Sequence, residues 1–237
     1  MQQILSLFFI NTLIGGAFTL LHLQKKEPFL KKRILSKFIY FFLINLSIIF
    51  SVIFNNNIFR LIFVSLTCIA FYELSKNQTQ CKKFFISSIL IFLFIAFISI
   101  NYIFTAQALE ILLLYCFCIS FDGFSQAIGQ SLGRLKLAPD ISPNKTIEGS
   151  LGGLFFVFIN YWILFPSKFN LKSISILSII VLACLSGDLL ASFYKRKVNI
   201  KDFSNLIPFH GGVLDRFDSF FMAIFSAGVL SLFGYGL

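Results

Sequence analysis

The acidic residues of this chain are few and gathered in one part of the sequence. Only 10 of the 237 residues are Asp or Glu. Asp188 is the most informative, because it interrupts a long apolar stretch, where an ionisable residue is costly and marks a functional site by default. An ion pair with Lys195 or Arg196, or a polar contact between helices, is the alternative explanation. Seven of the ten acids lie between residues 122 and 218, namely Asp122, Asp140, Glu148, Asp188, Asp202, Asp215 and Asp218.

Asp215 and Asp218 are three positions apart at the start of the last apolar stretch. This spacing puts both carboxylates on one face of a helix. Neighbouring carboxylates repel unless a cation lies between them, and oxygen ligands alone favour a hard ion such as Mg²⁺. The alternative is an acidic first turn that interacts with the helix dipole. We therefore expect a magnesium site here, and leave a second cation open.

Basic residues alternate with these acids along the chain. Arg presents a planar fork to phosphate and Lys a point charge, although orientation in a membrane also places basic residues at one face. Gly211 and Gly212 would let the backbone pass close to a ligand, and the preceding His210 could carry a proton, accept phosphate or stabilise the turn. Together these residues favour a metal–polyphosphate substrate. The candidate phosphate ligands are Lys145, Lys195, Arg196, Lys201 and Arg216.

The elements that carry these residues are predicted to be membrane helices. The chain is 57% hydrophobic and 13% charged, with a mean hydropathy of +0.87, which excludes a water-soluble domain. A bilayer span takes about 20 apolar residues, and backbone in lipid must be helical or form a closed barrel. We expect an all-α, polytopic membrane protein. Its eight apolar stretches are 1–23, 38–54, 58–75, 84–104, 107–121, 149–166, 173–194 and 219–237.

The distribution of basic residues predicts the topology. Loops 24–37, 76–83, 122–148 and 195–218 share one side of the membrane and hold 17 of the 20 Lys and Arg residues. Basic residues crowd the cytoplasmic side, so both termini are predicted outside and the acids at the cytoplasmic face. The net charge of +10 therefore reflects topology, and no nucleic-acid partner is expected.

Two of the stretches need a separate interpretation. The fifth is short and ends at Asp122, so it and its neighbour could instead form a helical hairpin or a re-entrant element. The first has no basic residue before its apolar core, unlike a cleaved signal peptide, and is expected to remain as a helix.

Three segments resemble the motifs of the CDP-diacylglycerol synthases, also called phosphatidate cytidylyltransferases. The run from Ser192 to Asp218 is similar to the family signature, including Lys195, Arg196, Pro208, His210, both glycines, Asp215 and Arg216. The segment 141–149 resembles a second motif, and the segment 186–189 a third. The resemblance covers about residues 115–237. We expect a single transmembrane domain, with a hydrophobic part (1–114) and a catalytic part (115–237) that carries these motifs.

The resemblance implies transfer of a cytidylyl group from CTP to phosphatidic acid or a related lipid phosphate, in a bacterial cytoplasmic membrane. Homodimers are a further family expectation. A CTP-dependent kinase of an isoprenoid or other lipid alcohol, and a transporter, are the alternatives. The roles expected are metal binding by Asp188, Asp215, Asp218 and Asp202, catalysis by these with Lys201, and substrate binding by Asp122, Lys145, Ser192, Lys195, Arg196, His210, Gly211, Gly212 and Arg216.

Overall fold

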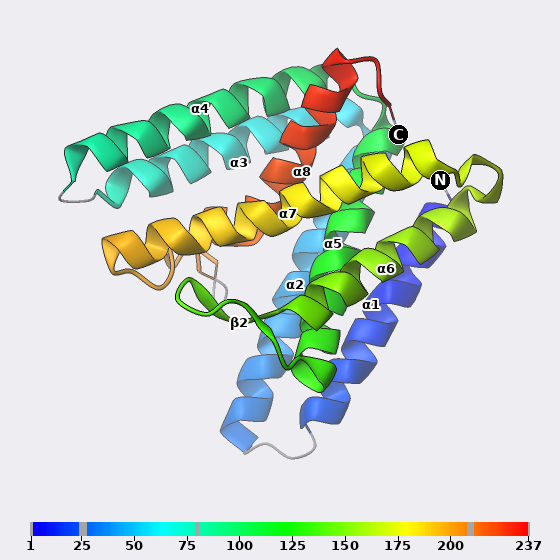
Figure 1. Ribbon diagram of the computed structural model, residues 1–237, viewed down its shortest axis with the longest axis horizontal. Helices are drawn as coiled ribbons and strands as arrows, with labels where there is room; N and C mark the ends of the chain where they lie inside the picture. Colours follow the sequence, from blue (N-terminus) through cyan, green and yellow to red (C-terminus); the bar gives the residue numbers. More distant parts are fainter. Residues whose placement is uncertain (1, 24–27, 79–80, 208–210, 237) are drawn as a thin grey trace.

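The computed structural model describes residues 2–23, 28–78, 81–207 and 211–236, and within them the chain is all-α apart from one small hairpin (Figure 1). Each of the eight predicted apolar stretches corresponds to a helix. The elements are α1 (Gln2–Leu23), α2 (Pro28–Phe54), α3 (Asn56–Lys76), α4 (Lys82–Thr105), α5 (Ala108–Leu132), β1 (Lys136–Ala138), β2 (Ser142–Thr146), α6 (Ile147–Leu164), the 3-10 turn η1 (Pro166–Lys168), α7 (Leu171–Val198) and α8 (Leu214–Leu232).

Five helices in the described residues, α3 to α7, are long and apolar enough to cross a membrane. Shorter apolar helical segments lie in α1 (Gln2–Gly15) and α2 (Phe38–Phe54). Helix α8 is outside this set, and its first turns carry Asp215, Arg216 and Asp218. The chain is thus an all-α protein with several apolar helices, as predicted.

Helix α5 lies at the centre of the molecule and packs against α1, α2, α6, α7 and α8 (Figure 1). Its first half is almost entirely buried, from Ile111 to Cys118. Helices α3 and α4 lie side by side on one flank, and α8 packs between α4 and α7. The acid-bearing helices α5, α7 and α8 therefore all contact one another.

The fifth element is longer than the sequence indicated. Helix α5 continues through Asp122 to Leu132, so it is neither a short span nor a hairpin, and Asp122 lies within a helix instead of beginning a loop. The extension is held against α6, where the rings of Phe124 and Phe156 stack with centroids 3.8 Å apart. Because residues 122–132 mix polar side chains and glycines with only a few apolar ones, hydropathy alone did not mark them as helical.

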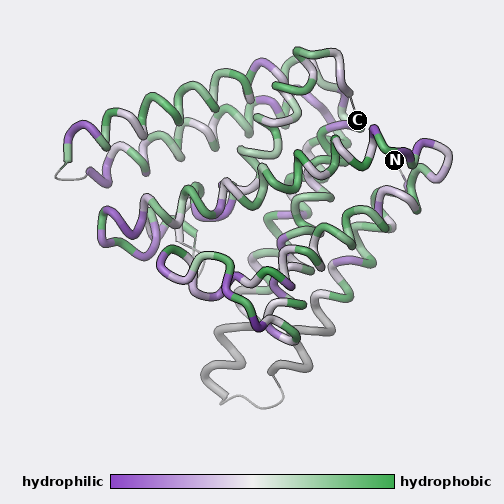
Figure 2. The backbone as a smooth tube through the Cα atoms, in the orientation of Figure 1, coloured by the Kyte–Doolittle hydropathy of each residue, from purple (hydrophilic) through white to green (hydrophobic). Residues whose placement is uncertain are grey.

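The start of α6 and the end of α7 are defined by the residues that flank them. Thr146 ends β2 and accepts a hydrogen bond from the Gly149 amide at the start of α6. Helix α7 ends at Val198, where Asn199 adopts a left-handed conformation with φ 58°. Lys195 and Arg196 are therefore on the last turns of α7 and not in a loop. Figure 2 shows this end of α7 as hydrophilic and the hairpin as mixed, beside mostly hydrophobic helices.

Candidate active site

Three helices bring Asp122, Asp188 and Asp218 together. Asp122 is on α5, Asp188 on α7 and Asp218 on the second turn of α8, and the three carboxyl groups interact electrostatically. We call these three residues the acidic cluster. Asp122 is exposed, while Asp188 and Asp218 are partly buried. Ser219, which follows Asp218 on α8, is buried.

Helices α7 and α8 approach each other closely at Gly187, next to Asp188. A Cβ atom at Gly187 would lie 2.5 Å from the Asp218 carbonyl oxygen and 2.9 Å from Cγ of Met222. Carbon atoms do not come so close to a backbone oxygen, so only glycine permits this crossing. The segment Ser186–Gly187–Asp188 thus has two roles. It carries the Asp188 carboxylate, and its glycine allows α8, with Asp218, to pack close to α7.

Gly187→Ala is expected to push α7 away from α8 and to separate Asp188 from Asp218. Overpacking of this kind costs about 1–3 kcal/mol, so both the thermal midpoint and the turnover should fall. Gly15→Ala is the matched control, because a Cβ at Gly15 on α1 would meet no atom within 4 Å. Thermal unfolding of the two variants in detergent measures the difference. Equal stability of both would contradict the close approach.

Asp188 is paired with a lysine from the hairpin. Lys145 Nζ lies 2.6 Å from Asp188 Oδ2, and the Ser192 hydroxyl donates to Asp188 Oδ1 at 3.3 Å. The alternative prediction of an ion pair between Asp188 and Lys195 or Arg196 is therefore wrong, because the partner of Asp188 is Lys145. Strand β2, which carries Lys145, also contacts α5, α6 and α7, so the hairpin lies over the acidic cluster.

Asp215 has a different environment from Asp218. Its side chain is 3% exposed, and Oδ1 lies 2.6 Å from Lys195 Nζ. Its Oδ2 accepts hydrogen bonds from the Phe203 amide at 2.7 Å and the Gly212 amide at 2.9 Å. Three donors already satisfy this carboxylate, which therefore joins the two described parts of the α7–α8 connection (residues 199–207 and 211–213) to the end of α7. A metal role for Asp215 stays a prediction.

Gly211 fixes the end of the α7–α8 connection. Its φ is 83°, a conformation that side chains rarely adopt, and a Cβ there would lie 2.9 Å from Asp215 Oδ2. The same Cβ would approach Asp202, which is exposed like its neighbour Lys201. The metal role expected for Asp202 and the catalytic role for Lys201 stay predictions. His210 lies outside the described residues.

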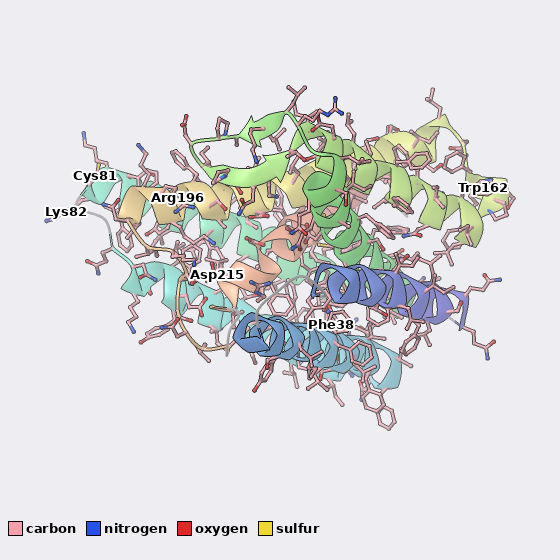
Figure 3. All side chains as sticks on the ribbon, turned by 90° about the horizontal axis from the view of Figure 1, so that it is seen from below. Phe38, Cys81, Lys82, Trp162, Arg196 and Asp215 are labelled. Carbon is pink, nitrogen blue, oxygen red and sulfur yellow. The ribbon has the colours of Figure 1, made fainter. Side chains whose placement is uncertain are left out.

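The remaining basic candidates surround this region. Arg196 is exposed, and its Nε donates to the Ile141 carbonyl of the hairpin at 3.2 Å. Arg216 is also exposed, and its charge acts on Asp122. Figure 3 shows Arg196 toward one end of the molecule, together with Cys81 and Lys82, while Trp162 lies at the opposite end. Of the phosphate-seeking groups, Lys145, Lys195 and Arg216 are thus near the acidic cluster.

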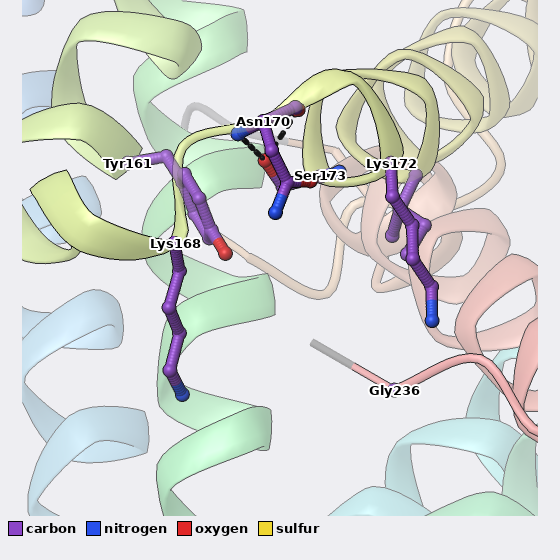
Figure 4. A pocket seen from close by; sticks show the side chains of 7 residues that line it. Tyr161, Lys168, Asn170, Lys172, Ser173 and Gly236 are labelled. Carbon is purple, nitrogen blue, oxygen red and sulfur yellow. Dashed lines mark hydrogen bonds between the residues drawn. The ribbon is translucent and has the colours of Figure 1, made fainter.

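A cavity of about 250 Å³ lies elsewhere, where α6 is joined to α7 (Figure 4). Asp188 is 16 residues beyond Lys172 on α7, or about 24 Å along the helix at 1.5 Å per residue. The cavity therefore does not belong to the candidate site. It is lined by Tyr161, Lys168, Asn170, Lys172, Ser173, Ile176 and Gly236.

Sequence reasoning missed one acid at this site. Glu73, near the end of α3, is 1% exposed and accepts hydrogen bonds from Ser204 and from the amides of Val213 and Leu214. It lies outside the run of seven clustered acids, in the half of the chain without a recognised motif. The only signal for it was a carboxylate near the end of an apolar stretch.

A family model described as the cytidylyltransferase family matches residues 2–233. The chain belongs to this family. The match extends beyond the motif-bearing region, residues 115–237, and includes the hydrophobic helices α1 to α4. The cytidylyltransferase assignment therefore covers the half that contributes Glu73.

Several curated relatives of this cytidylyltransferase family member are named phosphatidate cytidylyltransferase. The protein from Staphylococcus aureus strain COL is 34% identical over 174 residues, 69% of this chain and 65% of the relative. That from Rickettsia prowazekii is 43% identical over 126 residues (48% and 54%), and that from Aquifex aeolicus 41% over 111 residues (47% and 41%). The matches thus cover about two thirds or less of the relatives' length. No solved structure matches the chain.

Proposed function

We propose that this protein transfers the cytidylyl group of CTP to phosphatidate, giving CDP-diacylglycerol and pyrophosphate. The observation that carries the proposal is the acidic cluster of Asp122, Asp188 and Asp218, with Lys145 and Lys195 beside it. Carboxylates with lysines at an accessible face suit a polyphosphate substrate and its cations. The names of the relatives supply the lipid substrate.

The reaction needs little acid–base chemistry from the protein. An oxygen of the lipid phosphate, already an anion, attacks the α-phosphorus of CTP and forms a new P–O bond. The bond between the α-phosphorus and the bridging oxygen breaks, and pyrophosphate leaves with that electron pair. Lys145, Lys195 and Arg216 would neutralise the phosphates and hold them in line, which is how positioning and charge stabilisation supply most of the rate.

The acidic cluster fits Mg²⁺ by the chemistry of its donors. Within the described residues, no three His, Cys, Asp or Glu side chains are grouped so that they could hold a metal ion by themselves. Mg²⁺ commonly binds through one or two carboxylates and takes its other ligands from water and substrate phosphates. Asp188 and Asp218 would hold it, and the ion would supply neutralisation of the polyphosphate charge. Lys145 already places a positive charge 2.6 Å from Asp188.

The membrane arrangement is part of the same proposal. Eight spans with both termini outside put the ends of α3, α5 and α7 and the start of α8 on the side with the most basic residues, the cytoplasmic side. Glu73 and Asp218 come from these ends, and Asp122 and Asp188 come from the second halves of α5 and α7. The acyl chains would stay in the bilayer of a bacterial cytoplasmic membrane while the lipid phosphate meets CTP at its surface.

An assay of purified protein tests the reaction and the substrate together. The protein in detergent micelles receives CTP, Mg²⁺ and either phosphatidate, another lipid phosphate or an isoprenoid alcohol. We expect CDP-lipid and pyrophosphate with phosphatidate and no product with the alcohol. CDP release with the alcohol would instead indicate a lipid kinase, and CTP-independent uptake into liposomes would indicate a transporter.

A further inference from the structure

Glu73 is a buried carboxylate whose hydrogen-bond donors lie in the α7–α8 connection and at the start of α8. Its Oε1 accepts from the Ser204 hydroxyl at 2.6 Å and from the Val213 amide at 2.9 Å. Its Oε2 accepts from the Leu214 amide at 2.8 Å. A buried carboxylate is tolerated only when its oxygens are well bonded, and here both oxygens are.

The two amides belong to the start of α8. Amides of a helix's first turn have no partner within the helix, and a carboxylate there also interacts favourably with the helix dipole. Val213 precedes the helix and its apolar side chain makes no capping hydrogen bond. Glu73 therefore supplies the cap from α3, across 140 positions of the sequence.

The surrounding backbone is built to admit this carboxylate. A Cβ at Gly212 would lie 2.6 Å from both Glu73 carboxylate oxygens, so a side chain there would displace it. One turn after Glu73, the Asn77 side-chain amide donates to the Phe203 carbonyl at 2.8 Å, and the Tyr194 hydroxyl donates to the Asn77 carbonyl at 2.7 Å. The end of α3 is thus bonded both to α7 and to the connection that leads into α8.

The position of the cap determines where the acids of α8 lie. Asp215 follows Leu214 directly, and Asp218 is one turn further along the same helix. Because Glu73 bonds the first amides, it fixes the position of this turn along the axis of α8 and its rotation about that axis, relative to α7. A displacement of about 1 Å in a catalytic group can reduce the rate about 100-fold.

We propose that Glu73 is a positioning residue for cytidylyl transfer, which holds the first turn of α8 so that Asp218 faces Asp188. This inference rests on the proposed function. It assigns a task to the hydrophobic half of the chain, whose helix α3 contributes Glu73.

Glu73→Gln tests the proposal, because the amide keeps the size of the side chain but loses its charge and one acceptor. We expect kcat to fall about 10- to 100-fold, with KM for CTP changed less than about threefold. Glu73→Asp should recover part of the loss, since the charge is restored on a shorter side chain. Glu110→Gln on α5 is the matched control, because Glu110 bonds Tyr102 and not α8.

Hydrogen exchange provides a readout that does not depend on activity. In Glu73→Gln, amides of residues 211–218 should exchange faster, while residues 220–232 keep their protection. If Glu73→Gln does not fold, Ser204→Ala removes one donor and should give the same pattern with a smaller loss of kcat. Faster exchange with unchanged kcat, or a lower kcat with unchanged exchange, would overturn the positioning role. An inactive wild-type protein would instead contradict the proposed function, with the exchange pattern still testing the cap.

Discussion

Asp218→Asn is expected to lower CDP-lipid formation about 100- to 1,000-fold, the usual effect of removing one charged group that stabilises a transition state. Asp218 is partly buried on α8, and its carboxylate interacts with those of Asp122 and Asp188. In the wild-type protein, Asp218 Oδ1 accepts a hydrogen bond from the Ser219 amide at 2.7 Å. Asn has the same shape, and its side-chain oxygen can still accept this hydrogen bond. The loss should therefore be in activity and not in folding.

The control for this variant is Asp140→Asn. Asp140 is exposed at the turn between β1 and β2, and its replacement should leave turnover within about twofold. Initial rates at saturating CTP and phosphatidate, over a range of Mg²⁺ concentrations, measure both variants. Near-normal turnover of Asp218→Asn at every Mg²⁺ concentration would exclude Asp218 from the reaction.

Asp188→Asn is expected to have an effect of similar size, and its pairing with Lys145 allows a sharper experiment. The two side chains lie 2.6 Å apart. If the pair only held the hairpin on α7, the double variant would recover much of the turnover that each single variant loses. In the double variant no charge is left without its partner. If both groups serve the reaction, the double variant stays inactive.

We therefore expect Lys145→Gln, Asp188→Asn and the double variant all to lose at least about 100-fold in turnover. The double variant should nevertheless melt closer to the wild-type temperature than Asp188→Asn, which leaves Lys145 without its partner. Lys136→Gln is the matched control, since Lys136 is exposed on β1 of the same hairpin. Recovery of turnover in the double variant would make the pair structural.

The positions of the helices could be predicted from the sequence because an apolar run has few alternatives in lipid. The extension of α5 to Leu132 could not, since Asp122, Gln126 and Gln130 interrupt the hydropathy there. That extension moves Asp122 from a loop into the acidic cluster.

Spacing along the chain predicted candidates but not their partners. Asp215 and Asp218 share a spacing typical of a common metal site, yet Asp215 accepts from Lys195 and two backbone amides. Lys145 pairs with Asp188 through a hairpin that no local pattern relates to α7. Glu73 acts across 140 positions, so only the folded chain reveals it.

CTP labelled with ³²P distinguishes cytidylyl transfer from phosphoryl transfer to a lipid. Wild-type protein, phosphatidate and Mg²⁺ are incubated with CTP carrying ³²P at either the α- or the γ-position, and the lipid is then extracted. We expect α-label in the lipid fraction and γ-label in the released pyrophosphate. Transfer of γ-label to a lipid, with α-label left in soluble CDP, would contradict this expectation.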